Sequence, residues 1–110
     1  MAPGPVFLLG GGWNEAAFPL TYGRFVAAVR AGGGTRIACV LLDGDERDAY
    51  FARSAALAAG GAADVVPVFV SPERPLRAED LATASGVFVG GGLTPAYHDA
   101  IRPTADTWLP

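Results

Sequence analysis

The amino-acid sequence predicts an α/β fold with a doubly wound, mainly parallel sheet that carries helices on both faces. Short apolar runs rich in β-branched and aromatic residues recur along the chain, and segments with helical spacing separate them. The runs are near-continuous in hydrophobicity instead of alternating, which is typical of strands that are buried on both faces. The four predicted strands are Val6–Leu9, Arg36–Leu42, Val65–Val70 and Gly86–Val89.

A first helix is expected between the first two strands. Four apolar residues there recur at positions i, i+3, i+4 and i+7, so they would form one stripe along a helix. They are Tyr22, Phe25, Val26 and Val29. The glycine run at 32–34 then ends the helix, because glycine readily adopts the left-handed conformation in which helices commonly stop.

A second helix is expected to start near Asp45 and to run through an alanine-rich stretch to Gly60. Acidic residues such as Asp48 fall in its first turn, where the helix dipole favours negative charge. The segment 72–83 is less regular, and we expect a short helix around Ala78–Ala82 within it.

The last helix is expected after the fourth strand. Thr94 is the expected N-cap and Pro95 the first helical residue, a position where the missing amide hydrogen costs nothing. Leu93, Tyr97 and Ile101 would then share one face of this helix.

These elements predict one domain over residues 1–110, with an incomplete flavodoxin-like sheet of about four strands. The end of the sequence, Trp108–Pro110, follows a polar turn at a point where a doubly wound sheet would continue into another strand. We therefore interpret the sequence as the truncated, amino-terminal part of a longer domain.

Composition excludes several classes of function. Hydrophobic residues make up 51% of the chain and charged residues 17%, which indicates a globular protein. The net charge of −3 comes without a basic patch, so no nucleic-acid partner is expected. The longest aliphatic stretch, Ile37–Leu42, is too short to span a bilayer, so no membrane partner is expected. A single cysteine and no basic region before Val6–Leu9 favour a cytoplasmic protein.

Two triple-glycine runs are the candidate functional segments. Gly10–Gly12 follows the first predicted strand and Gly90–Gly92 follows the fourth. Ligands of open parallel sheets bind at the carboxyl ends of the strands. With the first strand in the centre, the two runs should lie within about 5–10 Å, one or two strand spacings, and face one crevice. Glycine amides in such a crevice could stabilise a developing negative charge, as in an oxyanion hole.

The candidates for this role are the amides of Gly90, Gly91 and Gly92. Residues expected to line the crevice are Gly11, Gly12, Trp13, Leu93 and Thr94. Each run could also be only a tight strand-to-helix turn; we favour a turn for the first run and a site for the second. Neither run fits a dinucleotide fingerprint or a phosphate loop.

The segment Gly86–Pro95, which reads Gly-Val-Phe-Val-Gly-Gly-Gly-Leu-Thr-Pro, resembles the strand and triple glycine of the dipeptidase E/cyanophycinase family of serine peptidases. The opening Phe7–Trp13 and the Arg36–Leu42 strand follow the order of that family, whereas Leu93 replaces its usual asparagine.

The resemblance implies a glutamine-amidotransferase-like fold whose members cleave small peptides. It implies that the amide of Gly91 or Gly92 supplies half of the oxyanion hole. It also implies a serine nucleophile on a sharp elbow after the next strand, and a histidine further on, both beyond Pro110.

The sequence shows no catalytic group of its own. Ser54, Ser71 and Ser85 do not lie in a Gly-x-Ser-x-Gly elbow, and we interpret them as surface or capping residues. Cys39 lies within an apolar strand, where a thiol is inert. His98 is expected in solvent near acidic and basic neighbours. The chain alone is therefore predicted to be inactive.

An acidic cluster after the second strand could suggest a metal site. Its members are Asp43, Asp45, Glu46 and Asp48. Counted as a calcium loop from Asp43, the glycine position holds Asp48 and the glutamate position holds Ser54, so the loop pattern fails. We explain the cluster by helix-terminus electrostatics and expect neither a metal nor a cofactor.

The leading hypothesis is therefore the amino-terminal portion of a serine-peptidase-like hydrolase that lacks its nucleophile. It predicts that codons beyond Pro110 encode a strand and a serine elbow within about 10–20 residues. The alternative is a non-catalytic, flavodoxin-like module that binds a small ligand at the glycine loops. In either case, an open edge on the fourth strand would favour self-association.

Overall fold

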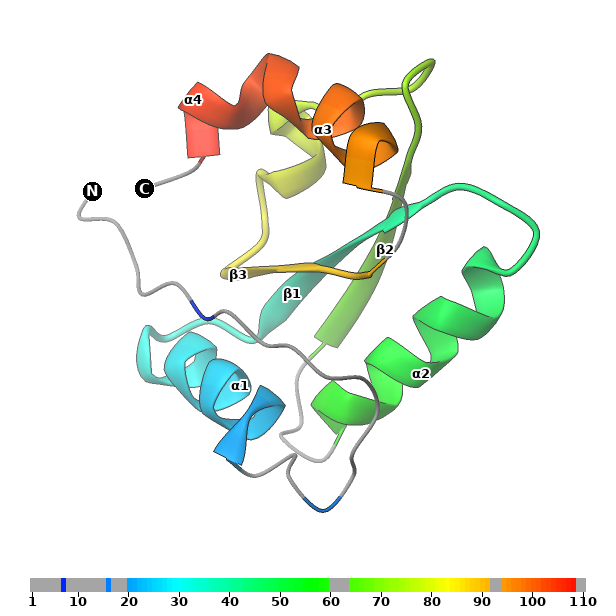
Figure 1. Ribbon diagram of the computed structural model, residues 1–110. Helices are drawn as coiled ribbons and strands as arrows, with labels where there is room; N and C mark the ends of the chain where they lie inside the picture. The colour runs from blue at the N-terminus through cyan, green and yellow to red at the C-terminus, as the bar shows by residue number, and fades with distance from the viewer. Residues whose placement is uncertain (1–6, 8–15, 17–19, 60–63, 92–93, 109–110) are drawn as a thin grey trace.

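The computed structural model describes residues 7, 16, 20–59, 64–91 and 94–108. Figure 1 shows the elements in these ranges. They are helix α1 (Tyr22–Ala31), strand β1 (Arg36–Leu42), helix α2 (Arg47–Ala59), strand β2 (Asp64–Val70), 3-10 helix η2 (Ala78–Leu81), strand β3 (Gly86–Val89), helix α3 (Thr94–Ile101), 3-10 helix η3 (Arg102–Thr104) and helix α4 (Ala105–Trp108).

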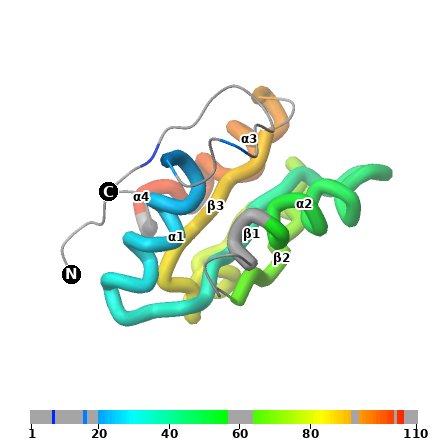
Figure 2. The backbone as a smooth tube through the Cα atoms, turned by 90° about the horizontal axis from the view of Figure 1, so that it is seen from below, coloured from blue at the N-terminus to red at the C-terminus, as the bar shows by residue number. Residues whose placement is uncertain are grey.

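The three described strands form a parallel sheet in the order β2-β1-β3, which confirms the predicted α/β class. In the register of the central strand, Val40 lies opposite Val68 on one side and Val89 on the other. Figure 2 shows β1 between the other two strands. The predicted first strand, Val6–Leu9, lies outside the described residues except for Phe7, which is in no strand. Since both edges of β1 are paired, β1 holds the central position that we had expected for the first strand.

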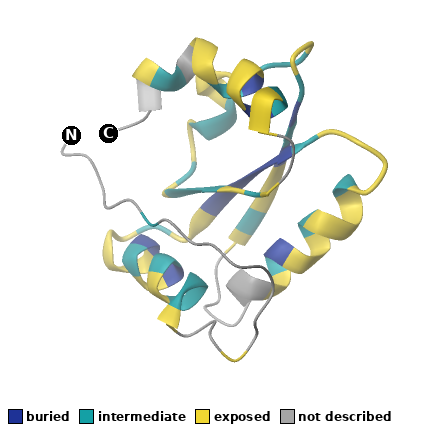
Figure 3. Cartoon of the chain, in the orientation of Figure 1, coloured by how far each residue is buried: buried dark blue, intermediate teal, exposed yellow. Residues whose placement is uncertain are grey.

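Helices cover both faces of this sheet, as predicted. Consecutive strand residues point to opposite faces, so β1 contributes to two separate apolar clusters. On the face of α1, Ile37 packs with Val26 and Val29. On the other face, Ala38 and Val40 pack with residues of β2, the 71–77 connection and α3, namely Val68, Val70, Leu76 and Ala100. β1 is accordingly the most deeply buried strand (Figure 3).

The helix boundaries follow the sequence signals closely. Gly33 has a φ of 89°, a conformation suited to glycine, and the glycine run ends α1 as expected. α2 begins at Arg47, two residues after the expected start, and α3 begins at Thr94, one residue before the first helical residue that we had expected, Pro95. The short helix expected around Ala78 is present as η2.

The segment after α3 corrects one prediction. We had expected a polar turn before Trp108, whereas the chain continues there as η3 and α4. Pro103 is compatible with this, because it occupies the first turn of η3, where no amide donor is required.

Candidate functional site

The carboxyl ends of β1 and β3 form the point at which the chain connections of the sheet diverge. α2 follows β1 and contacts the same face of the sheet as α1, whereas α3 follows β3 and packs on the opposite face (Figure 1). Adjacent parallel strands with this arrangement open a crevice at their carboxyl ends, and ligands of open α/β sheets bind there. The Gly90–Gly91 segment lies at this position.

Gly90 cannot serve as an oxyanion-hole donor, which corrects one of the predicted roles. Its N–H donates to the carbonyl oxygen of Val40 at 3.1 Å and so extends the sheet by one hydrogen bond. A Cβ at this residue would lie 2.4 Å from Cδ2 of Leu41, which is itself buried. A side chain at position 90 would therefore force the end of the Leu41 side chain to move, and the Gly90 amide is already satisfied.

Gly91 has the features that the predicted role requires. It is exposed, and its N–H makes no hydrogen bond to any residue that the structure describes. A Cβ there would meet no described atom within 4 Å, so the space beside it is open to a ligand. Its carbonyl oxygen accepts a hydrogen bond from the hydroxyl of Tyr97 at 3.3 Å. Of the three glycines, Gly91 is thus the one that offers a free donor within the described ranges.

Tyr97 joins the ends of the two strands through its side chain. Its ring is buried, with 9% of the residue exposed, and the hydroxyl accepts from the N–H of Leu42 at 3.3 Å while donating to Gly91. Burial raises the pKa of Tyr97, and the hydrogen bond from Leu42 opposes this in part. The hydroxyl therefore stays protonated at neutral pH and remains a donor.

The other predicted crevice residues are only partly placed. Gly11, Gly12, Trp13, Gly92 and Leu93 lie outside the described residues. Thr94 is exposed and is the first residue of α3. Whether the two glycine runs face each other is consequently not shown, and this convergence stays a prediction.

The segment after β1, which the sequence assigned only to a helix terminus, contacts the end of β2, since the N–H of Asp43 donates to the carbonyl oxygen of Val70 at 2.8 Å. Residues 43–46 follow β1, whose neighbour on one side is β3. The carboxylate of Asp43 accepts from Nη1 of Arg47 at 2.9 Å, and the guanidinium of Arg47 also lies 4.6 Å from the ring centre of Phe69. The sequence could have indicated this placement, because residues 43–46 directly follow a buried strand.

No group of three or more His, Cys, Asp or Glu side chains within the described ranges could hold a metal ion. In the acidic cluster, Asp48 lies 3.7 Å from the Nε of Arg47, which also contacts Asp43. Arg47 thus balances two of the carboxylates near the start of α2.

The predicted non-catalytic residues lie in different parts of the fold, except that Ser54 and Cys39 are neighbours in the core. Ser54 is buried in α2 rather than on the surface, which corrects that interpretation, and its hydroxyl donates to the carbonyl of Tyr50 at 3.0 Å. Ser71 caps a turn as expected, since its Oγ accepts from the N–H of Arg74 at 3.0 Å. Ser85 is exposed.

Cys39 and His98 also occupy the environments that the sequence indicated. Cys39 is fully buried, and burial raises the pKa of its thiol to about 11, with Ser54 lowering it in part. The imidazole of His98 is exposed beside Asp99, with 3.3 Å between Nδ1 and Oδ1. Cys39 lies on β1, the histidine on α3, and neither contacts a serine in a way that forms a nucleophile and base.

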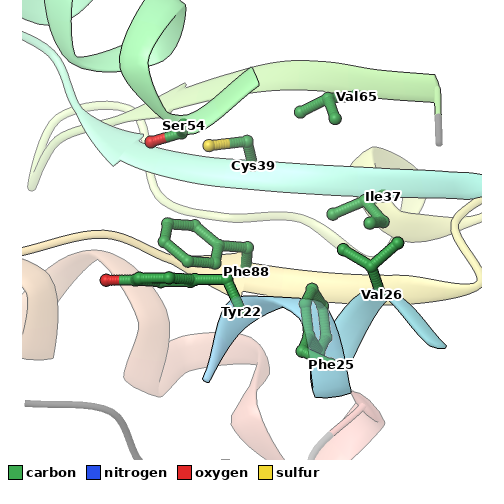
Figure 4. A pocket seen from close by; sticks show the side chains of 8 residues that line it. All are labelled: Tyr22, Phe25, Val26, Ile37, Cys39, Ser54, Val65 and Phe88. Carbon is green, nitrogen blue, oxygen red and sulfur yellow. The ribbon is translucent and has the colours of Figure 1, made fainter. Parts of the chain in front are cut away.

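A small apolar pocket lies between α1, α2 and the sheet (Figure 4). Its lining is Tyr22, Phe25, Val26, Ile37, Cys39, Ser54, Val65 and Phe88. No charged side chain lines it, and five of its eight residues belong to the apolar cluster under α1 or pack against it. We interpret it as an imperfection of the core and not as the functional site.

No family model, no curated protein and no solved structure matches this chain. The resemblance of Gly86–Pro95 to the dipeptidase E/cyanophycinase family accordingly stays a prediction from the sequence. In the part of the chain that the structure describes, every helix is too short or too polar to cross a membrane.

Proposed function

We propose that this chain supplies the backbone-amide half of an oxyanion-binding site in a cytoplasmic, serine-peptidase-like hydrolase that acts on small peptides. The observation that carries the proposal is the state of the Gly91 amide. This amide lies at the carboxyl end of β3 and makes no hydrogen bond to any described residue. The preceding amide, that of Gly90, donates to Val40 in the sheet.

The location of this amide supports a role in binding negative charge. Backbone N–H groups that are fixed before a ligand arrives stabilise an anion without reorganising. Gly91 is held between the sheet hydrogen bond of Gly90 and the contact of its own carbonyl with Tyr97. The missing side chain at position 91 lets a substrate carbonyl approach the backbone closely.

The chemistry needs a nucleophile and a base from residues other than those described. Ser54 and Cys39 are buried, Ser85 lies in the bend before β3, and His98 lies on α3. Covalent catalysis requires such groups within hydrogen-bond reach of one another. We therefore propose that the 110-residue chain does not hydrolyse peptides by itself, as expected from the sequence.

A second candidate, a non-catalytic module that binds a small anionic ligand, rests on the same amide and on the fact that the serine, cysteine and histidine side chains of the described residues form no pair of nucleophile and base. The two candidates differ in what the gene encodes after codon 110. The hydrolase predicts a strand and a Gly-x-Ser-x-Gly elbow within about 10–20 codons. A stop codon followed by unrelated sequence in every frame would contradict it and favour the binding module.

Titration with sodium acetate tests the anion site that both candidates share. In a ¹⁵N-labelled sample, the Gly91 amide resonance should move saturably with acetate and not with sodium chloride at equal ionic strength. An unchanged Gly91 resonance would contradict both candidates.

A further inference from the structure

Tyr97 occupies the place of a missing hydrogen bond between two strands. In a regular parallel ladder that contains the bond from Gly90 N–H to Val40, the next donor on β1 is the N–H of Leu42, and its partner is the carbonyl of Gly90. Here the Leu42 N–H donates to the hydroxyl of Tyr97 instead, and that hydroxyl donates onward to Gly91. A side-chain oxygen has replaced a backbone oxygen at the end of the sheet.

We propose that Tyr97 is a positioning residue, which holds the Gly91 amide in the direction needed to bind an anion. The segment between β3 and α3 contains consecutive glycines, whose backbone dihedral angles are the least restricted of any residue. The peptide group before Gly90 is tethered to Val40 through its N–H, and the peptide group after Gly91 is tethered to Tyr97 through its carbonyl. The peptide group between them carries the Gly91 N–H, so the two tethers limit its orientation.

The position of Tyr97 suits this role for two reasons. Its ring is buried and its residue lies in the first turns of α3, so the hydroxyl has a fixed origin. Both hydroxyl contacts are 3.3 Å long, at the weak end for hydrogen bonds, so they add little to global stability. The two tethers reduce the number of conformations open to these glycines, whose backbone freedom is the largest of any residue.

The proposal that Tyr97 serves anion binding rests on the proposed function, whereas its effect on the direction of Gly91 does not. Tyr97→Phe keeps the buried ring and removes only the hydroxyl. Tyr50→Phe is the control for losing a tyrosine hydroxyl near Tyr97, since Tyr50 is exposed and, within the described ranges, its hydroxyl makes no hydrogen bond to Leu42 or Gly91.

The experiment uses the ¹⁵N-labelled 110-residue chain and measures three quantities in each variant. They are the residual dipolar coupling of the Gly91 N–H, the hydrogen-exchange rate of the Leu42 N–H, and the shift of the Gly91 resonance with sodium acetate. We expect Tyr97→Phe to change the Gly91 coupling, to speed Leu42 exchange by roughly fivefold, and to weaken the acetate response. Tyr50→Phe should leave all three as in the wild type.

The outcomes separate the two proposals. If the wild type does not respond to acetate but the Gly91 coupling changes in Tyr97→Phe, the anion site fails and the positioning by Tyr97 stands. If the coupling is unchanged in a folded Tyr97→Phe, the positioning role is overturned whatever acetate does. If that variant does not fold, the hydrogen-exchange rates of the wild type test the proposal. A Leu42 amide that exchanges as fast as the exposed Asp45 amide would have no hydrogen bond to Tyr97, and the positioning role would be overturned.

Discussion

The hydroxyl of Tyr97 lies 3.3 Å from the carbonyl oxygen of Gly91, six residues earlier in the chain. The same hydroxyl also accepts a hydrogen bond from the Leu42 N–H. Tyr97 therefore connects α3 to the carboxyl end of β1 and to the loop that follows β3. The point of divergence is thus flanked by the Tyr97 side chain from α3 and by the backbone of Gly91. We expect Gly90, whose amide is bonded to Val40, and Gly91, whose amide has no described partner, to respond differently to substitution.

Gly90→Ala should lower the free energy of unfolding by about 1–3 kcal/mol, the usual cost of overpacking. The added methyl group would collide with Cδ2 of Leu41, which is 3% exposed and has little room to move. Gly91→Ala is the matched control and should change stability by no more than about 0.5 kcal/mol, since the space there is open. Urea denaturation followed by circular dichroism measures both, and equal losses in the two variants would contradict the packing described for Gly90.

Asp80→Asn should lower the free energy of unfolding by about 1–2 kcal/mol at neutral pH, a range that allows for screening at the partly exposed Arg74. The Asp80 carboxylate accepts from both terminal nitrogens of Arg74, at 2.7 and 2.8 Å, and from the N–H of Arg77 at 2.8 Å. Glu79→Gln, one residue away and exposed, should have no comparable effect.

The same carboxylate gives stability a dependence on pH. The hydrogen bonds from Arg74 hold the pKa of Asp80 below its ordinary value. A depressed pKa means that the stabilisation is fully present above the unfolded-state pKa, about 3.9, and is lost as pH falls through the folded-state pKa. Denaturation midpoints of the wild type should therefore fall more steeply than those of Asp80→Asn below about pH 4. Parallel curves would show that Asp80 does not titrate as described.

Cys39 should react with a disulfide reagent at pH 8 on the order of 100-fold more slowly than an exposed cysteine. Burial holds its pKa at about 11, and the thiolate is the reactive form. Reaction in urea should reach the normal rate, which provides the control. Because the folded-state pKa is raised, stability should also decline as pH rises from about 8.5 toward 11. Fast reaction of the folded chain would mean that β1 opens readily.

The outer edge of β3 should support self-association. Among the described residues β3 pairs with β1 only, and Val89 is 42% exposed. Apolar strand edges recruit further chains, and a lysine blocks them. We expect sedimentation velocity to show a dimer that Val89→Lys reduces. Val66→Lys is the control, because Val66 is 37% exposed on β2, a strand in which Pro67 already removes a backbone donor. A wild-type monomer, or equal effects of the two variants, would contradict this role for β3.

Local signals in the sequence predicted most of the elements. The strands Arg36–Leu42 and Gly86–Val89 have the predicted bounds, because continuous apolar runs bounded by glycine or charge are characteristic of buried parallel strands. α1 follows its stripe of apolar residues and ends at its glycine run. These features depend on neighbouring residues, which the sequence displays directly.

The predictions that were wrong or incomplete concern residues whose environment depends on contacts between distant parts of the chain. Whether the Gly90 amide is free depends on the pairing of β3 with β1, and no local pattern reveals that pairing. The burial of Ser54 depends on how α2 lies over Cys39. The hydroxyl of Tyr97 was predicted only as part of an apolar face, because its two partners come from separate strand ends.

The shift of the Gly91 amide with acetate, referenced to that of Gly90 in the same spectra, tests the central claim most directly. The two amides are adjacent, yet one is bonded to Val40 and the other has no described partner. A saturable shift at Gly91 with Gly90 nearly unmoved is the predicted result. If neither resonance moves, or both move together, the loop after β3 does not bind an anion through a free amide.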